Sequence, residues 1–137
     1  MSLLGAVHLA ATWALVGLIW TIQVVHYPLF AQVGREAFAA YHRRHTRQIT
    51  WIVAPLMLVE LGTAGWLVWE GGGGAWLLVS LGPLAFNWLS TGLVQIPLHH
   101  QLEQGYDAVS QRRLVATNWG RTLAWSSRGL CLLLDGL

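Results

Sequence analysis

Four long stretches of the chain are almost free of charged residues. They are residues 1–34, 48–69, 71–98 and 114–134. Together they contain three charged side chains, those of Glu60, Arg121 and Arg128. A helix needs about 20 mostly apolar residues to cross the hydrocarbon core of a bilayer. The pattern therefore predicts four transmembrane helices, at about 3–30, 40–69, 75–98 and 110–134.

Composition agrees with this interpretation and excludes other classes of protein. Hydrophobic residues make up 55% of the 137 residues and charged residues 10%, whereas soluble domains carry about 25% charged residues. The same numbers exclude a disordered chain, which would be poor in aromatic residues. Eight cations spread along so apolar a chain do not form a nucleic-acid-binding patch. We expect one all-α domain over residues 1–137, an integral membrane four-helix bundle.

The arginines predict how the bundle is oriented. Arginine is retained on the cytoplasmic side of a membrane, and six arginines lie in two of the three connections. They are Arg35, Arg43, Arg44, Arg47, Arg112 and Arg113. The glycine turn at 70–74 and both ends of the chain contain none. We therefore expect a multi-pass protein of the bacterial inner membrane with both termini outside.

The two halves of the chain share short sequence matches. Pro28-Leu29 matches Pro97-Leu98, and the segment 47–51 matches 121–125. These matches indicate either two repeated helical hairpins or a coincidence, and the sequence leaves both open. Each of the two prolines should kink or end its helix.

A helical hairpin turning near Gly34 would place certain polar residues at equal depth. In such a hairpin, level residues have numbers that sum to about 68. The level pairs would be His26 with His42, Gln23 with His45, and His8 with Glu60. Two polar layers follow, separated by roughly 27 Å at 1.5 Å per residue.

The inner layer carries the main chemical signal, a set of histidines. Its predicted metal ligands are His26, His42, His45, His99 and His100. Neutral imidazole binds first-row transition metals, so we expect iron or copper ahead of zinc, or haem, for which His26 with His99 or His100 is the better axial pair. Gln23 and Gln95 would lie beside the cofactor. Alternatively, the histidines outside the first helix are interfacial side chains bonded to lipid phosphate and water.

Two further polar pairs complete the candidate site. His8 and Glu60 in the outer layer indicate a buried hydrogen bond or, alternatively, a proton relay, and Arg128 could join them. Asn118 and Arg121 stand three residues apart on the last helix and would face the same side. We expect these two as catalytic residues that orient a developing negative charge, although Arg121 could instead bind helix carbonyls.

The chain resembles the small bacterial membrane proteins related to anthrone oxygenases. The likeness lies in four short helices, a histidine-bearing first loop and the segment Asn118-Trp119-Gly120-Arg121-Thr122. The resemblance implies an oxidoreductase, such as an oxygenase, acting on a lipophilic small molecule that arrives from the membrane lipids. It does not set the cofactor. The residues also allow a small transporter or metal carrier, or a helper subunit of a membrane complex. A chain of this size could form a homo-oligomer to enclose its site.

Overall fold

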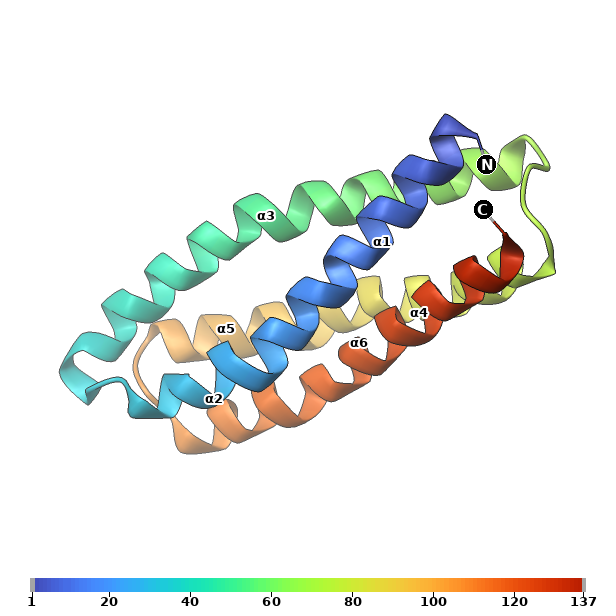
Figure 1. The fold of residues 1–137 in the computed structure, drawn as a ribbon. Helices are drawn as coiled ribbons and strands as arrows, with labels where there is room; N and C mark the ends of the chain where they lie inside the picture. Colours follow the sequence, from blue (N-terminus) through green and yellow to red (C-terminus); the bar gives the residue numbers. More distant parts are fainter. Residues whose placement is uncertain (1, 137) are drawn as a thin grey trace.

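The computed structural model describes residues 2–136, and these residues form helices joined by short connections. Four helical stretches lie side by side along one axis (Figure 1). The first stretch consists of α1 (Leu3–Thr21), the π-helix η1 (Ile22–His26), α2 (Tyr27–Leu29) and the 3-10 helix η2 (Phe30–Gln32). The others are α3 (Arg35–Trp69), then α4 (Ala75–Ser90) with the π-helix η3 (Thr91–Gln95) and α5 (Ile96–Glu103), and finally α6 (Ala108–Asp135). The predicted all-α four-helix bundle is confirmed.

Three of the four stretches are long and apolar enough to cross a membrane. They are Leu3–Gln32, Arg35–Trp69 and Ala75–Glu103. The predicted fourth span, α6, has 28 residues but is less apolar, because the side that it buries carries polar residues such as Asn118, Arg121 and Arg128. Polar side chains in membrane proteins face the bundle interior. The fourth helix fits this rule and lies beside α4 along the bundle (Figure 1).

A π-helical turn precedes a proline in each half of the chain. η1 is followed by Tyr27 and Pro28, and η3 is followed by Ile96 and Pro97. The ring of a proline inside a helix clashes with the carbonyl four residues earlier, and a wider turn relieves this clash. Both helices therefore continue beyond their prolines instead of ending there.

The two halves differ in burial at one aligned position. Trp51 and Trp125, which the sequence match aligns, are 77% and 1% exposed. The two hairpins share the π-turn before the proline but not the burial of this tryptophan.

The termini and the glycine turn lie at one end of the bundle (Figure 1). Gly71 follows α3 with a φ of 65°. The backbone N–H of Gly71 donates to the Val68 carbonyl and that of Gly72 to the Leu67 carbonyl, which completes a Schellman motif. The Asp135 carboxylate at the end of α6 accepts from the backbone N–H groups of Gly74 and Leu77, at 2.9 and 3.0 Å. These bonds fix the start of α4 against the end of α6.

The six arginines predicted in the connections lie at the opposite end, where they belong to the first part of α3 and of α6 and not to loops. There, Asp107 begins α6 by accepting from the backbone N–H of Ser110 at 2.7 Å. Hydrogen bonding from Ser110 holds the pKa of the Asp107 carboxyl below its usual range.

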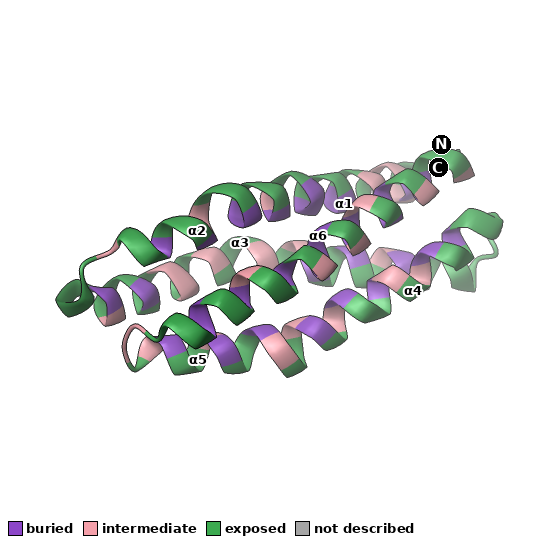
Figure 2. Ribbon diagram, turned by 90° about the horizontal axis from the view of Figure 1, so that it is seen from below, coloured by how far each residue is buried: buried purple, intermediate pink, exposed green. Residues whose placement is uncertain are grey.

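Burial follows the inner sides of the helices, as Figure 2 shows. Large apolar side chains such as Trp69 and Leu93, 87% and 73% exposed, lie on the outside. An apolar outer surface is unfavourable in water and suits contact with lipid tails.

Candidate functional site

A buried ion pair lies in the half of the bundle that carries the termini. Nε of Arg128 on α6 donates to Oε1 of Glu60 on α3 at 2.8 Å, and neither side chain is exposed. Nη2 of Arg128 also donates to Nε2 of His8 at 2.9 Å. The structure thus brings His8 and Glu60 together through Arg128, without a hydrogen bond between their side chains.

Neighbouring side chains satisfy the rest of this group. Thr12 donates to Glu60 Oε1 at 2.9 Å, and Trp125 Nε1 donates to Oε2 at 3.2 Å. Ser80 accepts from Arg128 Nη1 at 2.7 Å, and Thr63 Oγ1 lies 2.7 Å from His8 Nδ1. We call this set the Arg128 network: His8, Thr12, Glu60, Thr63, Ser80, Trp125 and Arg128. It links α1, α3, α4 and α6, so its first role is structural.

The first hairpin has a different register from the one predicted. His8 is level with Thr63, Thr12 with Glu60, and His26 with His45, whose rings are 5.6 Å apart. The numbers in these pairs sum to 71 or 72 rather than 68, so the offset is about one helical turn. The predicted pairs of His26 with His42 and Gln23 with His45 are therefore not the ones that meet. The turn itself lies where it was predicted, between Gln32 and the start of α3 at Arg35. The offset therefore arises within the helices, since the first stretch includes a π-helix and a 3-10 helix and does not rise by a uniform 1.5 Å per residue.

Four of the five predicted histidine ligands gather at the other end of the bundle. Nε2 of His42 lies 2.9 Å from Nδ1 of His99, and Nε2 of His99 lies 3.0 Å from the Tyr27 hydroxyl. The ring centroids of His42 and His45 are 6.4 Å apart. We call His26, His42, His45 and His99 the histidine group. His100 lies outside it, because its side chain is 72% exposed and pairs with Glu103 at 3.5 Å.

Two nitrogens of the histidine group are buried and have no hydrogen-bond partner in the described part of the chain, residues 2–136. They are His42 Nδ1 and His45 Nε2. His99 uses both ring nitrogens, one toward His42 and one toward Tyr27, and would have to give up a bond to become a ligand or a haem axial ligand. In the described part of the chain, no three His, Cys, Asp or Glu side chains are arranged to hold one ion.

The two glutamines predicted beside a cofactor instead face α6. Gln23 accepts from Asn118 Nδ2 at 2.8 Å and donates to the Val115 carbonyl at 3.2 Å. Gln95 donates to Thr117 Oγ1 at 3.0 Å, and its Oε1 has no partner among the described residues. Both glutamines belong to π-turns, which direct them at the last helix.

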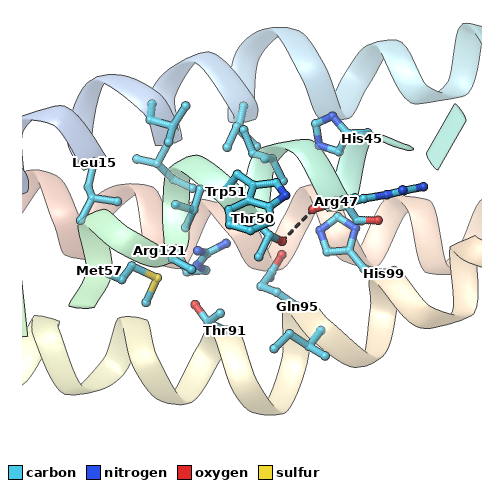
Figure 3. A pocket seen from close by; sticks show the side chains of 18 of the residues that line it. Leu15, His45, Arg47, Thr50, Trp51, Met57, Thr91, Gln95, His99 and Arg121 are labelled. Atoms are coloured by element: carbon cyan, nitrogen blue, oxygen red, sulfur yellow. Dashed lines mark hydrogen bonds between the residues drawn. The ribbon is translucent and has the colours of Figure 1, made fainter. Parts of the chain in front are cut away.

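A large cavity lies between α3 and the helices that face it. Its volume is about 940 Å³. Most of its wall is apolar, with Leu15, Ile19, Met57, Trp88 and Trp125 among the lining residues. Figure 3 shows the polar groups on its wall: His45 comes from α3, Gln95 from η3, His99 from α5 and Arg121 from α6. We call this space the Arg121 cavity.

Arg121 lies at the wall of this cavity and is only 5% exposed. Its Nη1 donates to Asn118 Oδ1 at 3.1 Å, and its guanidinium carbon lies 5.0 Å from the centre of the Trp125 ring. Its Nε is buried without a partner within residues 2–136. Asn118 thus accepts a hydrogen bond from Arg121 and donates one to Gln23. These two bonds hold the guanidinium in place.

Sequence reasoning did not find several residues of this site. Tyr27, Trp88 and Thr91 line the cavity, and none belongs to a polar or charged motif. Tyr27 lies between His26 and Pro28 in the sequence. Its place beside a predicted ligand and a predicted kink was the available signal. The cavity itself depends on how α3 lies against α5, and no local pattern records that arrangement.

Comparison of the chain with known protein families, with curated proteins and with solved structures finds no match.

Proposed function

We propose that the protein is a membrane-embedded oxidoreductase that binds a lipophilic small molecule in the Arg121 cavity. The observation that carries the proposal is the cavity itself, an apolar space with a few polar side chains on its wall. These side chains include His45, Gln95, His99 and Arg121. Binding sites for small molecules are typically apolar with a few converging polar groups.

The opening of the cavity suits a ligand that arrives from the bilayer. Trp51 and Leu58 on α3 and Ile96 on α5 line the cavity and are also exposed on the outside of the bundle. An apolar molecule dissolved among lipid tails can enter between these side chains without crossing water. Lateral entry favours a lipophilic ligand over a hydrophilic one.

The histidine group adds proton-transfer chemistry beside the cavity. Tyr27 and His99 line it, and hydrogen bonds of 3.0 and 2.9 Å connect Tyr27, His99 and His42 in a row. A hydroxyl and two imidazoles in series can move a proton between a bound molecule and the loop end of the bundle. Many oxidations of organic molecules release protons together with electrons. This row would carry the protons.

Electron transfer requires a redox cofactor as well. The residues that would hold a transition metal are His42 and His45, each with a buried nitrogen that has no partner within residues 2–136. His26, whose ring lies 5.6 Å from that of His45, would have to move closer to become the third ligand. A bound iron or copper ion would supply the exchange of electrons with the substrate. The resemblance to anthrone-oxygenase-related proteins favours the same class of reaction.

Filling the cavity tests the proposal. Ala54 lines the cavity, whereas Ala85 is an exposed alanine of α4 that does not. Native mass spectrometry of protein purified from its membrane should detect a bound lipophile in the wild type and in Ala85→Trp. Ala54→Trp should lose it while remaining folded. Equal occupancy in both tryptophan variants would show that the cavity is not the binding site.

A further inference from the structure

Arg121 is a buried cation to which the described part of the chain provides no anion. Within residues 2–136 the ion pairs are Arg128 with Glu60 and His100 with Glu103. Arg121 is 5% exposed, and its hydrogen bond goes to the neutral amide of Asn118. A neutral amide satisfies a donor but does not cancel a charge.

An unneutralised charge at this depth is costly. Arg121 lies thirteen residues from the start of α6 at Ala108, a distance of roughly 20 Å along the helix. Charged side chains inside membranes are expensive and normally pair with an opposite charge or a water-filled space. Arg128, on the same helix, follows this rule through Glu60, whereas Arg121 faces the ligand cavity.

We propose that the bound ligand supplies the missing charge and is a lipophilic weak acid, bound as its anion with its carboxylate or ionised phenol on Arg121. This inference rests on the proposed function, because it identifies the class of molecule that the cavity holds. Arg121 lines the cavity, and its guanidinium is a planar set of donors, which matches an oxyanion. The apolar body of the ligand lies along Met57, Leu15 and Trp88.

The depth of Arg121 also distinguishes this ligand from a membrane phospholipid. The phosphate of a phospholipid stays in the headgroup layer, outside the hydrocarbon core of about 30 Å. Reaching Arg121 would require dragging a phosphate and two acyl chains toward the middle of the bundle. A molecule with one small head can enter as its neutral acid and ionise beside the guanidinium, passing its proton to the row of Tyr27, His99 and His42.

A fluorescent fatty acid and its ester provide a direct test. cis-Parinaric acid and its methyl ester differ in the charge of the head group. Binding of either probe to the purified protein is measured by energy transfer from tryptophans of the cavity wall, which are Trp51, Trp88 and Trp125. The wild type should bind the acid at least about tenfold more tightly than the ester. Arg121→Gln should bind both probes alike, with an affinity near that of the wild type for the ester. Arg112→Gln, which removes an exposed arginine of the same helix outside the cavity, should keep the wild-type preference.

The outcomes separate this inference from the proposed function. Equal saturable binding of acid and ester to the wild type would overturn charge recognition and leave the lipophile site standing. No saturable binding of either probe would count against both.

A preference for the acid that survives in Arg121→Gln would place the anion on another cation that lines the cavity, such as Arg43 or Arg47, and would also overturn the inference. If Arg121→Gln does not fold, Arg121→Met decides the matter, because it also removes the charge and leaves no polar group without a partner: loss of the preference for the acid supports the inference, and an unchanged preference contradicts it.

Discussion

Glu60 and Arg128 form an ion pair of 2.8 Å between two helices, and both side chains are fully buried. The pair also holds His8, Thr12, Ser80 and Trp125 by hydrogen bonds. Because every helical stretch contributes to this network, we regard it as the main polar contact that fixes how the helices pack.

Removing one member of the pair should therefore destabilise the bundle. Glu60→Gln leaves the Arg128 charge buried without compensation, and breaking a buried pair in this way costs about 3–5 kcal/mol. Thermal unfolding of the detergent-solubilised protein should report the loss, while Glu70→Gln, at an exposed glutamate, should have little effect. The double variant Glu60→Leu with Arg128→Met should recover much of the stability, since no lone charge remains. Wild-type stability in Glu60→Gln would show that the pair does not hold the helices together.

The histidine group makes a prediction about metal content. Protein isolated from its native membrane should contain stoichiometric iron or copper, and the double variant His42→Ala with His45→Ala should lose it because both free nitrogens disappear. X-ray absorption should detect nitrogen ligands at about 2.0–2.2 Å. His100→Ala, a change outside the group, should retain the metal. A folded double variant with full metal content would place the metal elsewhere.

The arginine distribution predicts the orientation in the membrane. With Cys131 replaced by serine, a cysteine at Gly72 in the glycine turn should react with a membrane-impermeant maleimide added from outside. A cysteine at Gln104, in the loop at the other end, should react only after the membrane is opened. Both positions are exposed, so a difference in reactivity reports the side of the membrane. The reverse pattern would place the termini in the cytoplasm.

Much of the fold is readable from the sequence because membrane helices reveal themselves by the absence of charge. The predicted spans differ from the observed helices mainly at the loop end, where α3 already begins at Arg35 and α5 continues to Glu103. Amphipathic helix ends look like loop sequence, because they contain the arginines and histidines. The level pairs also assume two regular α-helices, whereas the first stretch contains a π-helix and a 3-10 helix, and its register against α3 differs by about one helical turn.

The site was harder to predict than the fold. The sequence placed the five predicted histidine ligands at one end of the bundle. It could not show that His42 bonds to His99 across two helices or that His100 faces outward. Arg121 and Arg128 look alike in sequence, seven residues apart on one helix. The structure separates them, because Arg128 meets Glu60 and Arg121 meets an open cavity.

The central claim, that a lipophilic molecule occupies the Arg121 cavity, is tested most directly by photoaffinity labelling in vesicles. A photoreactive lipophile should label Met57, which lines the cavity and is only 3% exposed, and an excess of a non-reactive lipophile should abolish that label. Labelling of Leu133, which is exposed on α6, should be neither saturable nor competed. Competed labelling at Met57 that disappears in Ala54→Trp is the predicted result. Labelling confined to exposed positions such as Leu133, with none at Met57, would contradict the claim.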